Sequence, residues 1–144
     1  MKKDRVFLDS DVILDLLTER EPHFAAVLNL FIGIQNKKIL AYTSPVVIAN
    51  VFYIMARHSN KEKALRALIK IKALIKVLSC GDEEIELALS SDFTDFEDSI
   101  QYYTALNHKM DFILTRNVKD YKNANMNVIT PFEYINSTLW IILR

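Results

Sequence analysis

The 144-residue sequence contains few residues that crosslink or interrupt a chain: one cysteine, two glycines and three prolines. The lone cysteine, Cys80, cannot form an internal disulfide, and this usage is typical of a reducing cytoplasm. No apolar run approaches the ~20 residues that a membrane span needs. Only three apolar residues follow the basic start of the chain, which is too few for a signal peptide. These absences predict a soluble, cytoplasmic protein with little irregular loop.

Net charge is also lacking, since 18 Lys and Arg side chains balance 18 Asp and Glu side chains. Overall basicity therefore gives no argument for nucleic-acid binding, although a local basic patch remains compatible with it. Apolar residues make up 51% of the chain, so it should fold rather than stay disordered. Its length fits a single domain, spanning residues 1–144.

The most informative stretch is V-F-L-D-S-D-V-I-L-D, from Val6 to Asp15. Its first three residues form an apolar run typical of a strand buried on both faces. Ser10 then offers a helix N-cap, and apolar residues follow at helical spacing. Asp9 is thus expected where a strand ends and a helix begins, the place where open α/β sheets bind ligands. The alternative is that Asp9 and Asp11 only favour a helix N-terminus.

The rest of the chain alternates short apolar runs with amphipathic helices. Further strands are expected at 39–43, 76–79, 112–115 and 128–129, and helices after Pro22, Ser44, Asn60, Gly81, Thr94 and Thr130, with residues 119–127 as polar loop. This alternation predicts an α/β fold with a central parallel sheet and helices on both faces.

A second acidic group falls within the expected helix 95–107. Helical spacing places Asp95 and Asp98 along one line of this helix. If Asp9 also points there, two carboxylates ~4 Å apart would repel by about 4 kcal/mol at an effective dielectric near 20, unless a cation or a basic side chain neutralises them. Oxygen ligands favour Mg²⁺ or Mn²⁺ over zinc, and such a site can activate water against a phosphodiester. The alternative is that Asp95 and Glu97 only stabilise the N-terminus of the helix through its dipole.

Thr115 and Arg116 follow the expected strand 112–115 at the same edge of the sheet. Thr115 either orients Asp9 or a water, or is a plain strand-end hydroxyl. Arg116 pairs either with an RNA phosphate or with the acids themselves. The three histidines are scattered and are expected at the surface: His23, His58 and His108. The apolar end of the chain, 139–143 with Trp140, packs either on the body or on a second subunit.

Three motifs together carry a resemblance to a known family. F-L-D-S-D-V-I-L-D near the start, D-F-E-D-S-I-Q-Y-Y-T-A in the third quarter and I-L-T-R-N before K-D-Y resemble a PIN domain, over nearly the whole chain. The likeness is to the VapC-like ribonuclease toxins of bacterial toxin–antitoxin pairs. It implies a PIN-like α/β/α sandwich and an Mg²⁺- or Mn²⁺-dependent ribonuclease. It also implies RNA as substrate, a small antitoxin protein as partner and a homodimer.

The family's acidic positions are only partly filled. Asp9 matches the first acid, and Asp98 matches the acid of the second motif, with Asp95 as its neighbour. Asn50 and Asn117 stand where the family pattern has Glu and Asp, so they offer neutral oxygens without charge. The resemblance thus makes Asp9 and Asp98 the catalytic metal ligands, with Asp95 and Asp11 assisting.

The remaining expected members of this site are neutral. Ser10 and Thr115 would line the pocket or position water, as would the two asparagines at 50 and 117.

Two other functions remain open. With two asparagines at acidic positions, the domain could be a module that binds RNA or protein without cutting. Alternatively, Asp9-x-Asp11 and Thr115 resemble the haloacid-dehalogenase-type phosphatases, in which Asp9 would be the nucleophile. That family places its metal-binding acids after the threonine, whereas D-F-E-D precedes Thr115 here.

Overall fold

The computed structural model describes the backbone of residues 2–121 and 124–142, and side chains as far as residue 138. Five parallel strands form one sheet in the order β3-β2-β1-β4-β5. The strands are β1 (Arg5–Leu8), β2 (Leu40–Thr43), β3 (Lys76–Val77), β4 (Phe112–Leu114) and β5 (Asn127–Ile129). The expectation for the apolar tail and Trp140 concerns side chains outside this description.

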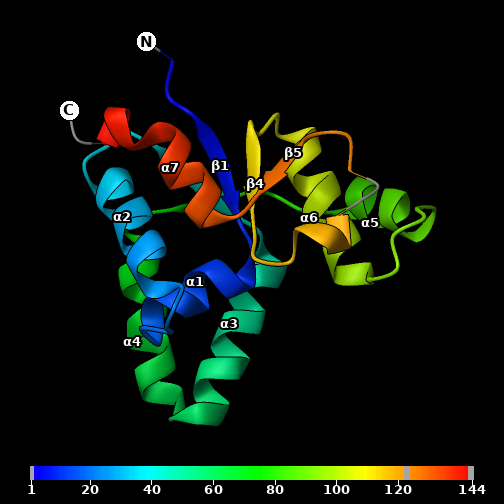
Figure 1. Ribbon diagram of the computed structural model, residues 1–144. Helices are drawn as coiled ribbons and strands as arrows, with labels where there is room; N and C mark the ends of the chain where they lie inside the picture. The colour runs from blue at the N-terminus through cyan, green and yellow to red at the C-terminus, as the bar shows by residue number, and fades with distance from the viewer. Residues whose placement is uncertain (1, 122–123, 143–144) are drawn as a thin grey trace.

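Helices cover both faces of the sheet. They are α1 (Ser10–Leu17), α2 (Phe24–Gln35), α3 (Pro45–His58), α4 (Lys61–Lys72), α5 (Asp82–Leu89), α6 (Phe96–Asn107) and α7 (Pro131–Ile142), with a 3₁₀ turn, η1 (Val118–Tyr121). In Figure 1, α2 and α7 lie on one side of the strands and α5 and α6 on the other, while α3 and α4 form a hairpin that extends below. The predicted α/β fold with a parallel sheet is confirmed.

Strand β1 is the centre of the sheet because it pairs with both β2 and β4. Val6, Phe7 and Leu8 are completely buried, as their unbroken apolar run predicts. Ile113 and Leu114 of β4 are buried beside them. Because β1 ends at Leu8, the next residue, Asp9, lies at the carboxyl edge of the sheet, where α1 begins.

The structure corrects three expected helix starts. Asp9, not Ser10, is the N-cap of α1, and its carboxylate accepts a hydrogen bond from the Ser10 backbone N–H at 2.8 Å. Asp95, not Thr94, caps α6, and its carboxylate accepts a hydrogen bond from the Asp98 N–H at 3.0 Å. Pro22 precedes α2 instead of opening it, since the next residue's N–H closes a turn onto the Arg20 carbonyl.

Two expected segments also differ in extent. The strand expected at 76–79 is limited to Lys76–Val77. The polar stretch 119–127 is not all loop, because it includes most of η1 and the first residue of β5. Tyr121 explains this difference: its ring is buried and its hydroxyl donates to Asp9, a contact between distant segments that local polarity does not reveal.

A buried ion pair joins α1 to the turn that follows β4. Asp15 is completely buried, and Arg116 donates to both of its carboxylate oxygens, at 2.7 Å from Nε and 3.2 Å from Nη2. This two-point geometry fixes direction as well as distance. The pair therefore holds the residues after β4 against α1, next to Asp9.

Within the described residues, no helix combines the length and the apolar character needed to cross a bilayer.

Loss of the Asp15 charge should destabilise the fold. We expect Asp15→Asn to lower the free energy of unfolding by about 3 kcal/mol, because the partly covered Arg116 loses its carboxylate partner. Urea denaturation at pH 7 measures this change. Glu62→Gln is the matched control: it breaks the exposed Glu62–Arg66 pair, and pairs of that kind contribute about 0.2–1 kcal/mol. Equal losses in the two variants would contradict a structural role for the buried pair.

Candidate active site

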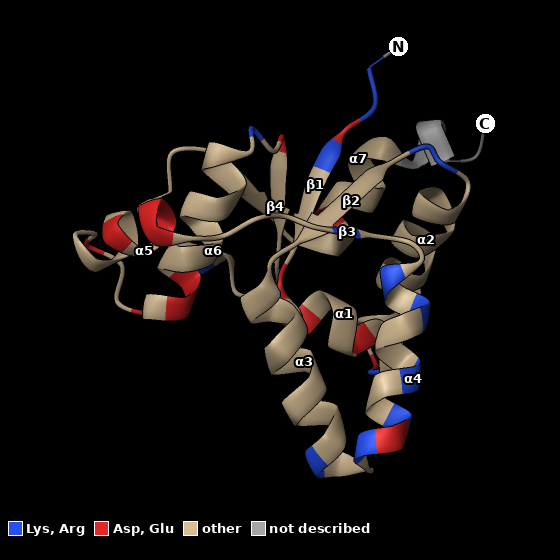
Figure 2. Cartoon of the chain, turned by 180° about the vertical axis from the view of Figure 1, so that it is seen from behind, with Lys and Arg blue, Asp and Glu red and all other residues tan. Residues whose placement is uncertain are grey.

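An acidic cleft of about 350 Å³ opens at the carboxyl edge of the sheet. Its walls come from α1, α3, α6 and the turn after β4. The lining residues are Asp9, Ser10, Asp11, Leu14, Arg20, Asn50, Ile54, Glu97, Asp98, Gln101 and Asn117. Figure 2 shows acidic residues on α1 and α6, whereas basic residues gather on α4. The topology therefore brings together acids that lie about 90 residues apart in the sequence.

Asp9 is held firmly at the base of this cleft. One carboxylate oxygen accepts from the Ser10 N–H at 2.8 Å and the other from the Tyr121 hydroxyl at 3.1 Å. Burial raises the pKa of Asp9, and the charge of Asp95 adds to the rise, while these hydrogen bonds and one from Thr115 oppose it. Burial and the Asp9 charge also raise the pKa of Tyr121, which keeps its hydroxyl a donor.

Asp98 faces the same region from the first turn of α6. Its pKa is raised to about 7, first by burial and then by the negative charges of Asp9 and Asp95. Both Asp9 and Asp98 line the cleft, so their carboxylates share one partly covered space in which like charges raise the pKa. Asp9 and Asp98 therefore point into a common negative pocket.

Asp11 is directed toward the turn after β4. Its Oδ2 accepts from the Arg116 backbone N–H at 3.0 Å, the Thr115 hydroxyl at 3.3 Å and the Asn117 amide at 3.4 Å. Its Oδ1 is buried and has no hydrogen-bond partner among the described residues. Burial, followed by the charge of Asp9, raises the pKa of Asp11 to about 6. Asp11 thus adds charge to the cleft and has one buried oxygen without a hydrogen-bond partner among the described residues.

The two asparagines lie at opposite walls. Asn50 of α3 donates to Glu97 of α6 at 3.0 Å, and Asn117 contacts Asp11. Deeper in the protein, Ser44 at the start of α3 donates to the buried Gln101 of α6 at 2.5 Å. These two hydrogen bonds connect α3 with α6.

Three expected site residues do not line the cleft. Asp95 is the N-cap of α6 and acts on the site through the Asp98 backbone and through its charge. Thr115 is completely buried and bonds Asp11. Arg116 pairs with Asp15. Of the two partners expected for Arg116, an RNA phosphate or an acidic side chain, the structure therefore contains the acidic one. Asp15 itself was not among the acids that the sequence indicated. The histidines at 23, 58 and 108 also stand outside this cleft.

Reasoning from the sequence missed several neighbours of the cleft. Tyr121 lies in a segment whose polarity indicates a loop, so no local signal marked it. Asp15 did carry a signal: it interrupts the apolar stripe of α1, and a carboxylate on a buried face requires a charged partner. Gln101 and Arg20 had no distinguishing pattern.

The donor set fits a hydrated hard cation better than a ready-made cage. Among the described residues, no three acidic, histidine or cysteine side chains are grouped closely enough to hold a metal ion. Mg²⁺, however, usually retains several waters and binds through one or two carboxylates. Asp9 and Asp98 provide that number, and the one unpartnered oxygen of Asp11 is oriented within the same negative environment. Arg20, which also lines the cleft, has its Nε 3.7 Å from Oδ1 of Asp15.

The raised pKa of Asp98 predicts a stability change with pH. Because its pKa is about 7 in the folded state and 3.8 as the ordinary value, the folded protein binds an extra proton between these values. Its stability therefore falls as pH rises through this window. We expect Asp98→Asn to remove part of this decline, so that the variant exceeds the wild type in stability at pH 8 and approaches it near pH 4.

Urea denaturation from pH 4 to 8 in EDTA measures the difference. Glu86→Gln, an exposed acid on α5, controls for the loss of one surface charge. Parallel curves for the wild type and Asp98→Asn would contradict the shared negative pocket.

Comparisons with known proteins agree with this architecture. A family model described as PIN domain matches residues 5–119. Ribonuclease VapC1 of Aquifex aeolicus (strain VF5) is 30% identical over 140 residues, which cover 93% of this chain and 95% of that protein. FitAcB of Neisseria gonorrhoeae superposes with a TM-score of 0.67 at 19% identity, covering 88% of this chain and 98% of the other. VapBC2 of Rickettsia felis, solved on a DNA fragment from its promoter, superposes with a TM-score of 0.64 at 15% identity, covering 87% and 96%.

The order of the strands, the acidic cleft at the carboxyl edge and the match over most of the chain lead to one conclusion. This chain belongs to the PIN domain family.

Proposed function

We propose that this protein is a divalent-metal-dependent ribonuclease that hydrolyses RNA phosphodiester bonds in the cytoplasm, as the toxin of a toxin–antitoxin pair. The observation that carries the proposal is the cleft lined by both Asp9 and Asp98, in which burial and the charge of Asp9 raise the pKa of Asp98. Membership of the PIN family and the 30% identity to a VapC ribonuclease support it.

Asp9 and Asp98 are the proposed ligands of Mg²⁺ or Mn²⁺. The bound ion would supply an activated water and stabilise the leaving oxygen of the phosphodiester. Ser10 and Tyr121 hold the Asp9 carboxylate in a single orientation. Asp95 holds the first turn of α6, and thereby the Asp98 backbone, in place. Such supporting contacts typically change metal affinity or activity by about 10–100-fold when they are lost.

Asp11, Asn50 and Asn117 are proposed as auxiliary members. Asp11 contributes negative charge from the wall that the turn after β4 fixes. The two asparagines are oriented by their contacts with Glu97 and Asp11 and offer neutral oxygens to water or substrate. A site of this composition should bind the cation more weakly than one with four carboxylates.

The proposed protein partner is a small antitoxin. Several solved structures with the same fold are toxin–antitoxin assemblies, including a complex from Klebsiella pneumoniae with a TM-score of 0.64 at 18% identity. A homodimer is proposed from the resemblance to the VapC-like toxins alone. Because both statements rest on relatives, co-purification with the product of a neighbouring gene and light scattering are their direct tests.

A non-catalytic RNA-binding module is the second candidate. It is favoured by the neutral Asn50 and Asn117 and by the lack of a three-ligand metal group among the described residues.

Cleavage of structured RNA tests the main proposal. We expect purified protein to cut RNA with Mn²⁺ or Mg²⁺ and not in EDTA, and Asp98→Asn to reduce the rate by at least about 100-fold because it removes a direct metal ligand. Electrophoresis of end-labelled RNA measures the rate. Equal cleavage by the wild type and Asp98→Asn would contradict the assigned site. Binding of the RNA without cleavage would favour the non-catalytic module.

Restoring a carboxylate should strengthen metal binding. We expect Asn117→Asp to tighten Mn²⁺ binding by about tenfold, because it adds an ionisable oxygen ligand beside Asp11. Isothermal titration calorimetry at pH 8 measures the affinity. Asn136→Asp, which adds the same charge on the exposed face of α7, is the control. No difference between the two variants would place Asn117 outside the metal's surroundings.

A further inference from the structure

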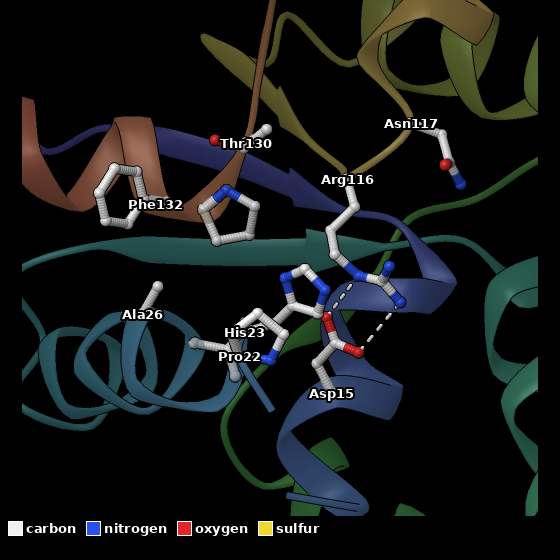
Figure 3. A pocket seen from close by; sticks show the side chains of 10 residues that line it. Asp15, Pro22, His23, Ala26, Arg116, Asn117, Thr130 and Phe132 are labelled. Atoms are coloured by element: carbon white, nitrogen blue, oxygen red, sulfur yellow. Dashed lines mark hydrogen bonds and ion pairs between the residues drawn. The ribbon is translucent and has the colours of Figure 1, made fainter. Parts of the chain in front are cut away.

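A second cavity, of about 500 Å³, lies next to the acidic cleft and is lined by Asp15, one helical turn after Asp11 on α1. It is formed by the starts of α2 and α7 together with the turn after β4. Figure 3 shows Phe132 at one end and the Arg116–Asp15 pair at the other, with His23 between them. The cavity falls within the range of about 300–1,000 Å³ that is typical of small-molecule sites.

The lining of this cavity combines flat and apolar groups with a few polar ones. Phe132 is 65% exposed, so most of its ring is accessible to a ligand. His23 faces the same space, two prolines, an alanine and a valine supply apolar wall, and Thr130 and Asn117 add polar groups. Aromatic rings, histidine and arginine are the side chains on which proteins stack unpaired RNA bases.

The charge of the cavity argues for a neutral occupant. Asp15 binds Arg116 at two points, so this guanidinium is already neutralised and is poorly suited to capture a phosphate. A planar base is uncharged and can stack or hydrogen-bond without disturbing that pair.

The two cavities adjoin each other. Asn117 lines both of them, and Arg20 of the acidic cleft stands 3.7 Å from Asp15 of the second cavity. In Figure 3, Asn117 lies beyond Arg116, on the side away from Phe132. A nucleotide next to a phosphate bound through a cation at Asp9 and Asp98 would therefore lie close to this cavity.

We propose that the cavity bounded by His23, Phe132 and Arg116 receives one unpaired nucleobase of the RNA, adjacent to the phosphate held in the acidic cleft. This site would give the protein its base preference, whereas the acidic cleft carries the chemistry. The inference rests on the proposed ribonuclease function, and its test is built so that the two can fail separately.

Binding of free nucleosides tests the cavity without any cleavage. Adenosine, guanosine, cytidine and uridine are titrated into the wild-type protein in EDTA, and the imidazole C–H signals are followed by NMR. We expect at least one nucleoside to shift the His23 signal saturably, while His58 and His108, which lie outside the cavity, serve as internal controls. Phe132→Ala should weaken this binding about tenfold, and Phe132→Tyr should retain it.

Two results of this titration would overturn the proposal. One is the absence of any saturable His23 shift with all four nucleosides. The other is an equal shift with ribose 5-phosphate, which would indicate an anion site instead of a base site.

Cleavage of an RNA pool with randomised positions tests the consequence for specificity. We expect the wild type to prefer one base beside the cut, and Phe132→Ala to reduce this preference about tenfold while cleavage stays metal-dependent. Tyr53→Ala removes an equally exposed ring, 64% exposed, on α3 and is the matched control. A preference unchanged in Phe132→Ala would overturn the proposal. Absence of cleavage in the wild type would refute the ribonuclease function, and the nucleoside titration would then decide the cavity alone.

Discussion

Burial of the carboxylates of Asp9, Asp11 and Asp98 in one negative cleft is the constraint on which the rest of the site depends. Burial is the first cause of their raised pKa values, and the charges of neighbouring acids raise these values further. Left to itself, such a cluster would turn its side chains toward bulk water. The structure prevents this with donors that lie around the acids: the Ser10 N–H, the Tyr121 hydroxyl and the Arg116 backbone N–H. Because these negative charges raise the free energy of the site, a bound cation would stabilise it.

The donors that hold the acids are themselves supported by the core. Tyr121 is buried next to Asp9. The side chain of Arg116 is paired with Asp15, while its backbone N–H donates to Asp11. One residue thereby sets the position of two acids one helical turn apart on α1. The fully buried β1 supplies the fixed base for this arrangement. The same contacts thus stabilise the fold and fix the geometry of the site.

Local patterns were sufficient to predict the framework of this protein. The apolar run ending at Asp9 and the alternation of strands with helices indicated the parallel sheet, and parallel strands bring their carboxyl ends to one edge. The meeting of Asp9 with Asp98 follows from that topology. The choice between neighbouring caps was not predictable in the same way, because Thr94 and Asp95 are both acceptable N-caps and differ by little in free energy.

Contacts between distant segments account for what the sequence did not reveal. Arg116 and Asp15 are 101 residues apart, and Tyr121 and Asp9 are 112 apart. No periodicity links such residues, and the polarity around Tyr121 even indicated a loop. Asp15 is the instructive exception, since a carboxylate within an apolar helix stripe implies a hidden cation somewhere in the chain.

The cleft has two walls that differ in how they are tied together. On one wall, α1 and the turn after β4 are joined by the Arg116 contacts; on the other, α3 and α6 are joined through Ser44–Gln101 and Asn50–Glu97. The two walls are not independent, because α3 also packs against α1 and the 3₁₀ turn η1 packs against α6. The shape of the opening is therefore set by the fold before any ligand arrives, and a polymer that enters it has to match that shape.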